Sequence, residues 1–118
     1  MNLKNCYERM GGDYDSLISR LGSEKIACKF IFKFAEDKNY SELIRTMETG
    51  DYETAFRAAH TLKGICLNLS LTGLAKSSGD LTEALRNNDI QSAKLLLPEL
   101  TKDYCQTVAL IEEYRNSL

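Results

Sequence analysis

Apolar residues recur at helical spacing along almost the whole chain, and this periodicity constrains the fold more than any other feature. After Asp51, apolar residues follow in steps of four, three, four and three, at Ala55, Ala59, Leu62, Cys66 and Leu69. This spacing lines one face of an amphipathic helix, whereas a half-buried strand would alternate at every second residue. A similar stripe follows at Leu74, Ser78, Leu81 and Leu85. Because the 118 residues include only one proline, the pattern predicts an all-α protein.

Residues that favour helix ends separate the apolar stripes. Gly11 and Gly12 close a short N-terminal segment, and Gly22 and Gly50 are suited to helix C-termini. Side chains that can cap helix N-termini precede the stripes at Asp13, Ser23, Asp51 and either Asn88 or Asp89. Asn39 followed by Glu42 resembles a capping box and predicts one more helix start.

The predicted helices are long and the loops between them are short, so consecutive helices should run antiparallel. We therefore predict an antiparallel up-down four-helix bundle with additional short N-terminal helices, forming one domain over residues 1–118. Pro98 falls inside the last apolar stripe, which runs from Ile90 to Ile111. We expect this proline to kink the last helix or split it in two.

Charge and cysteine content narrow the classes of function. The 15 basic and 17 acidic residues nearly balance, which gives no reason to expect binding to nucleic acid or to a membrane surface. One histidine and four cysteines without a Cys-x-x-Cys pair argue against a zinc site. The N-terminus lacks the apolar run of a signal peptide, so we expect reduced thiols and a cytoplasmic location.

The single histidine, His60, lies on the helix predicted after Asp51 but away from its apolar stripe. At about 100° per residue, the stripe lies roughly 180–260° from His60, so the imidazole should face water. The residues within roughly 60° of it on the same projection are Phe56, Arg57, Lys63, Gly64, Leu67 and Leu71.

These residues are suited to binding an anionic group at the imidazole of His60. The ring offers a nucleophilic nitrogen, and Lys63 and Arg57 can offset the negative charge of a phosphoryl group bound to it. Gly64 costs about 1 kcal/mol relative to alanine inside a helix, which makes sense if something bulky must sit beside the ring. Apolar surface suited to docking a partner is added by Phe56, Leu67 and Leu71. Each feature alone also fits an ordinary surface histidine, solvated charges or a second buried stripe.

The string Ala59-His60-Thr61-Leu62-Lys63-Gly64 resembles the signature of histidine-containing phosphotransfer (HPt) domains, His-x-Leu-Lys-Gly followed by small residues. The helix order, with the histidine on the second helix of the bundle, is similar to that of small stand-alone bacterial HPt proteins. Two residues depart from the family pattern. Ser70 stands where the family usually has glycine, and Leu67 stands where it usually has a small residue.

The resemblance implies a carrier in a two-component phosphorelay, with His60 as phosphoacceptor, Lys63 and Gly64 as further catalytic residues, and a docking surface at Phe56, Arg57, Leu67 and Leu71. The implied partners are response-regulator receiver domains and, in some systems, a hybrid histidine kinase. The receiver would supply the Mg²⁺, and this chain would need no cofactor or metal of its own. We expect a monomer without autonomous kinase activity.

Three other classes of protein compete with this interpretation. A sensor histidine kinase would need an ATP-binding domain, and the chain has neither a Gly-rich nucleotide motif nor room for that domain. A degenerate HPt-like protein that binds a receiver without accepting phosphate stays open because of Ser70 and Leu67. A helical adaptor in which His60 is incidental would explain the apolar face but not Gly64 beside Lys63.

Overall fold

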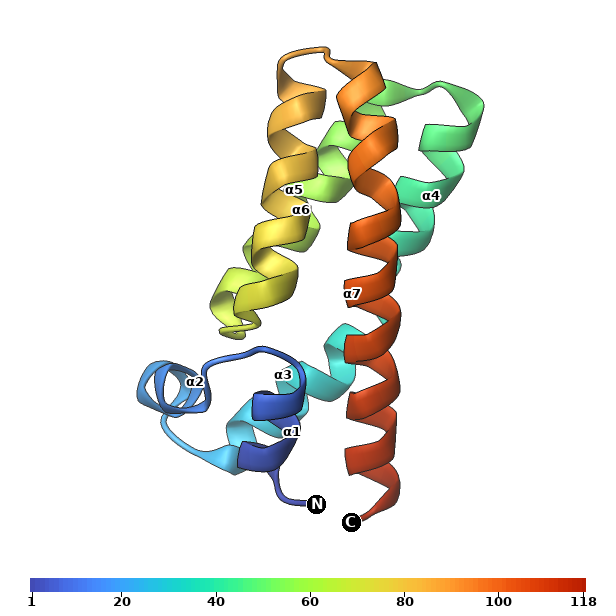
Figure 1. Cartoon of the computed structure of the whole chain (residues 1–118). Helices are drawn as coiled ribbons and strands as arrows, with labels where there is room; N and C mark the ends of the chain where they lie inside the picture. Colours follow the sequence, from blue (N-terminus) through green and yellow to red (C-terminus); the bar gives the residue numbers. More distant parts are fainter.

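The computed structural model describes all 118 residues, and every regular element in it is an α-helix (Figure 1). The seven helices are α1 (Leu3–Arg9), α2 (Tyr14–Leu21), α3 (Glu24–Ala35), α4 (Asn39–Thr49), α5 (Tyr52–Asn68), α6 (Thr72–Arg86) and α7 (Ile90–Asn116). The prediction of an all-α protein is therefore confirmed. None of these helices combines the length and the apolar character needed to cross a lipid bilayer.

Helices α4 to α7 form the predicted bundle. Each packs against the next along the chain, with short turns between them, so that neighbours run antiparallel (Figure 1). An aromatic pair joins the first and last of the four, because the rings of Tyr40 on α4 and Tyr104 on α7 stack with centroids 3.9 Å apart. Helix α5, which carries His60, is the second helix of this bundle, as the sequence predicted.

The additional N-terminal helices α1 to α3 lie at one end of the bundle, beside the C-terminal half of α7 (Figure 1). Hydrogen bonds attach them to the turn between α5 and α6. The hydroxyl of Tyr7 donates to the carbonyl of Leu69 at 2.7 Å, and the backbone N–H of Asp13 donates to the carbonyl of Ser70 at 2.9 Å. These bonds hold α1 and α2 against the end of α5.

Most helix ends occur where capping chemistry predicts them. The side chains of four residues accept hydrogen bonds from backbone N–H groups in the first turns that follow: Asp13, Ser23, Asp51 and Asp89. Gly22 and Gly50 end α2 and α4 in the left-handed conformation. The capping box was wrong, because Asn39 is already helical and donates its N–H to the carboxylate of Asp37 at 2.9 Å.

Pro98 does not split the last helix, because α7 continues through it over 27 residues. The proline removes the N–H that would bond the carbonyl of Lys94, a loss that normally weakens a helix interior. Pro98 is exposed to solvent, while Ala93 and Leu100 on either side of it are fully buried. Tertiary contacts therefore hold both halves of α7 in one helix, and of the two expected effects of the proline, a kink or a split, the split is wrong.

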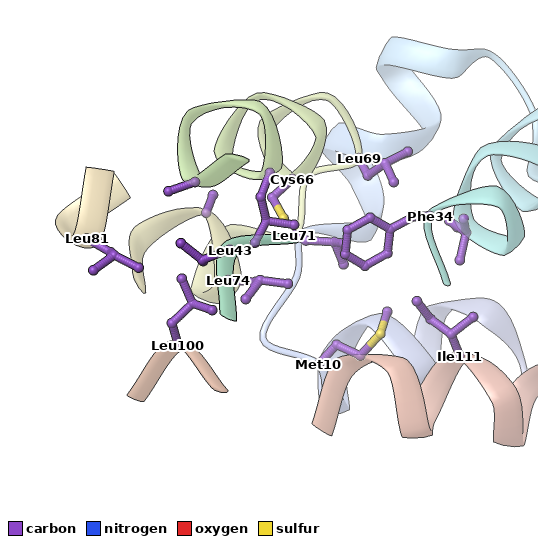
Figure 2. Close-up of a cluster of buried hydrophobic side chains, with 14 of the residues drawn as sticks. Met10, Phe34, Leu43, Cys66, Leu69, Leu71, Leu74, Leu81, Leu100 and Ile111 are labelled. Atoms are coloured by element: carbon purple, nitrogen blue, oxygen red, sulfur yellow. The ribbon is translucent and has the colours of Figure 1, made fainter. Parts of the chain in front are cut away.

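The core is one cluster of 27 buried hydrophobic residues that reaches from Leu3 to Tyr114. Figure 2 shows side chains from the bundle, including Leu43, Cys66, Leu74 and Leu100, converging on one region. All five stripe residues predicted from Ala55 to Leu69 belong to this cluster. Burial raises the pKa of the Cys66 thiol to about 12, so this cysteine is protonated at neutral pH and is a poor nucleophile.

Truncating the stripe should cost far more stability than truncating the opposite face of the same helix. Leu62 is fully buried and Leu67 is 49% exposed, and both lie on α5. We expect Leu62→Ala to lower the free energy of unfolding by about 2–5 kcal/mol, because it leaves a cavity. The matched variant Leu67→Ala should cost under about 1 kcal/mol. Urea unfolding followed by circular dichroism measures both, and equal losses would contradict the assigned orientation of α5.

Candidate functional site

The imidazole of His60 lies on the exposed face of α5, opposite the buried stripe, as predicted. We call this the site face, and it carries Phe56, Arg57, His60, Lys63, Gly64 and Leu67. The His60 side chain makes no hydrogen bond and no ion pair within the chain, so both ring nitrogens are free for an incoming group. Its ring is stacked on that of Phe56, with centroids 5.9 Å apart and planes inclined by 11°.

Lys63 is held close to α6 by its aliphatic stem. A β-carbon added at Gly79 of α6 would lie 3.6 Å from Cδ of Lys63, so the stem crosses the helix at this glycine. Lys63 is half-buried, and no carboxylate forms an ion pair with its ammonium group. The site face therefore contains a cation one turn from His60 whose charge is not neutralised within the chain.

Gly64 is open to solvent, and no contact within the protein explains it. A β-carbon added there would meet no atom within 4 Å. Packing therefore does not require a glycine at this position, although glycine costs about 1 kcal/mol relative to alanine inside a helix. Gly79 differs, because a β-carbon added there would make an ordinary contact with the stem of Lys63 at 3.6 Å. The space beside His60 at Gly64 is therefore open in the folded protein, and no side chain of the chain fills it.

Three of the four predicted docking residues lie on the site face, and the fourth is buried in the core. Leu67 is 49% exposed, and Phe56 is half-buried. Arg57 is exposed, but its guanidinium already pairs with Glu53 at 3.2 Å. Leu71 is only 1% exposed and belongs to the core, so its prediction as a docking residue is wrong (Figure 2). Helix α5 ends at Asn68, and the helical projection does not apply beyond that point.

The departure at Ser70 has a backbone explanation. Ser70 has a φ of 53° in the turn between α5 and α6, a left-handed conformation that favours glycine. The serine hydroxyl bonds the hydroxyl of Ser16 on α2 at 3.0 Å. Ser70 therefore keeps the turn and adds an attachment for the N-terminal helices, three residues after Leu67 at the end of the site face.

Two residues of α6 that sequence reasoning missed also reach the site face. Gly79 lies beneath the stem of Lys63, and Arg86 places its guanidinium carbon 5.0 Å from the centroid of the Phe56 ring. Arg86 also pairs with Glu83 at 3.1 Å. The glycine at position 79, inside a helix, was the only sequence signal for this contribution, because contacts between helices depend on how α6 is rotated against α5.

The arrangement offers one nucleophile and one nearby cation. No group of three or more histidine, cysteine, aspartate or glutamate side chains could hold a metal ion. No carboxylate bonds the imidazole, so His60 lacks the partner that orients the histidine of a hydrolytic triad. What the site face can do is present an imidazole nitrogen to a reactive, anionic group delivered from outside.

A comparison with protein-family models places this geometry in a known class. The model described as Hpt domain matches residues 32–116, which include the end of α3 and all of α4 to α7. Neither the search of curated proteins nor the search of solved structures gave a match. The family match covers more than half of the chain and contains the complete bundle with His60, Lys63 and Gly64 on its second helix. The chain therefore belongs to the Hpt domain family of histidine-containing phosphotransfer modules.

Proposed function

We propose that this protein carries a phosphoryl group on His60 and relays it between aspartates of receiver domains in a two-component phosphorelay. The observation that carries the proposal is the site face itself. An exposed imidazole without a hydrogen bond lies beside an unpaired cation, Lys63, and an unfilled space at Gly64. In a chain of the Hpt domain family, these features match what phosphoryl transfer needs from the acceptor.

The transfer step needs only one group from this protein. A nitrogen of the neutral His60 ring donates its lone pair to the phosphorus of an aspartyl phosphate on the receiver. The N–P bond forms as the P–O bond breaks, and the electron pair of that bond returns to the aspartate carboxylate. The second ring nitrogen keeps its proton. The reverse sequence delivers the group to the aspartate of another receiver, which supplies the Mg²⁺ for this chemistry.

The neighbours of His60 stabilise the negative charge of the transferred group and leave space for the receiver that delivers it. The ammonium of Lys63 can move toward the phosphoryl oxygens, since no carboxylate competes for it, and a charge-assisted contact stabilises the anion. Gly64 leaves room for the receiver to approach the ring. The exposed Leu67 and the half-buried Phe56, with Arg57 beside them, form the docking surface for a transient complex. We propose that the protein acts as a cytoplasmic monomer.

Transfer from a receiver tests this function directly. A purified receiver domain is phosphorylated with a small phosphodonor in the presence of Mg²⁺, separated from the donor and mixed with the protein. We expect the protein to gain one phosphoryl group that is labile in acid and stable in base, as phosphohistidine is. Receivers encoded near its gene are the first to be tried. If none of the receivers from its own cell labels the protein, the degenerate HPt-like protein or the helical adaptor becomes the better interpretation.

A further inference from the structure

The ring of His60 needs to be oriented, and the chain provides no hydrogen bond that does so. Catalytic histidines are commonly held by a bond from the second ring nitrogen to a carboxylate or a carbonyl. Here the specific contact of the imidazole is with an aromatic ring, that of Phe56, 5.9 Å away between centroids and inclined by 11°. The two residues are one turn apart on α5, so their side chains lie on the same face.

Phe56 in turn contacts a residue of the neighbouring helix. The guanidinium carbon of Arg86 on α6 lies 5.0 Å from the centroid of the Phe56 ring, within the range of a cation–π interaction. Arg86 also forms an ion pair with Glu83 at 3.1 Å. An open hollow of about 450 Å³ between the two helices is lined by both Phe56 and Arg86. The Phe56 ring packs with its inner side against the core, and on its outer side it contacts Arg86 and His60.

We infer that Phe56 is a positioning residue for His60, and that Arg86 acts through Phe56. The stack of Arg86, Phe56 and His60 restricts rotation of the imidazole while leaving both of its nitrogens unbonded. A hydrogen bond to one nitrogen would fix the ring equally well, but it would occupy an atom that the stack leaves free. This inference rests on the proposed function, because it concerns the orientation of the same acceptor for phosphoryl transfer.

The test compares Phe56→Leu with the wild type in two measurements. Leucine keeps an apolar side chain on the helix but removes the ring. We expect the rate of transfer from a phosphorylated receiver to fall by about threefold to tenfold, the range given by the loss of one aromatic pair. The NMR signals of the His60 ring protons should shift toward the values of a free imidazole, because the ring current of Phe56 is lost. Phe56→Tyr should restore both, and Arg86→Met should move the signals in the same direction by a smaller amount.

The chain contains a matched control for loss of a phenylalanine beneath an arginine. The guanidinium carbon of Arg115 lies 4.6 Å from the centroid of the Phe32 ring, at the contact between α3 and α7. We expect Phe32→Leu to leave the His60 signals and the transfer rate unchanged. Thermal unfolding by circular dichroism verifies that every variant is folded at the temperature of the assay.

The outcomes separate this inference from the proposed function. If the wild type is phosphorylated and Phe56→Leu transfers at the same rate, the positioning role is overturned and the proposed function survives. Equal NMR signals of the His60 ring in the two proteins would overturn the role as well. If no receiver phosphorylates the wild type while its NMR signals show the stack, the proposed function has failed. The positioning role of Phe56 is then overturned as well, even though Phe56 and His60 are stacked.

Discussion

The His60→Gln variant should gain no acid-labile phosphate from a phosphorylated receiver under conditions in which the wild type is labelled to completion. Glutamine is similar in length and polarity to histidine, but its carboxamide nitrogen has no lone pair available for attack on phosphorus. His60 is the only histidine in the chain, so no second imidazole can replace it. The expected effect is complete loss of transfer, measured as the fraction of phosphorylated protein on phosphate-affinity gels or by intact mass.

Stability should not explain this loss. The His60 side chain is exposed and makes no hydrogen bond, so the substitution removes only its contact with Phe56. We expect a change of at most about 1 kcal/mol in the free energy of unfolding. Binding of the variant to the receiver should persist, because the remaining docking residues are intact. A phosphate retained by folded His60→Gln would locate the acceptor on another residue and overturn the proposed function.

The sequence was sufficient to predict the helices because their signals are local. Capping depends on residues within one turn, and Asp13, Ser23, Asp51 and Asp89 all cap helices as their positions indicate. Pro98 shows where local reasoning fails. The intrinsic cost of the proline predicts a kink or a split, but burial of Leu100 and Ala93 on either side of it keeps α7 continuous. Such contacts depend on residues that are distant in the chain, so no window of sequence around Pro98 contains them.

In the candidate site, too, the sequence predicted the residues that share one helix but not the contacts made by a neighbouring helix. His60, Lys63, Gly64 and Leu67 lie on one helix, so the projection from periodicity was enough to place them on a common exposed face. The error at Leu71 arose because the projection was extended past Asn68, where α5 ends. The contributions of α6 could not be foreseen, since periodicity shows which side of α6 is buried but not which residues along its edge meet α5.

The second large effect is expected for the Gly64→Gln variant. This variant distinguishes a structural role of the glycine from a functional one. A β-carbon at Gly64 would meet nothing within 4 Å, so a longer side chain is accommodated by the fold. Glutamine is the better helix former by about 0.5 kcal/mol, and Gly64→Gln should unfold at the same or a slightly higher temperature. Its side chain would nevertheless fill the space one turn from His60 through which a receiver must approach.

We therefore expect Gly64→Gln to lower the rate of phosphoryl transfer by at least about a hundredfold, since a misplacement of about 1 Å costs that much in an aligned reaction. Gly64→Ala should give a smaller loss, because a methyl group fills less of the space. Gly73 on α6 provides the matched control, since it is also exposed and helical, and an added β-carbon would make only an ordinary contact with the Gly11 carbonyl at 3.7 Å. Gly73→Gln should transfer at the wild-type rate. Wild-type transfer by Gly64→Gln would show that nothing bulky approaches His60 from this side, and the glycine would then have no part in the reaction.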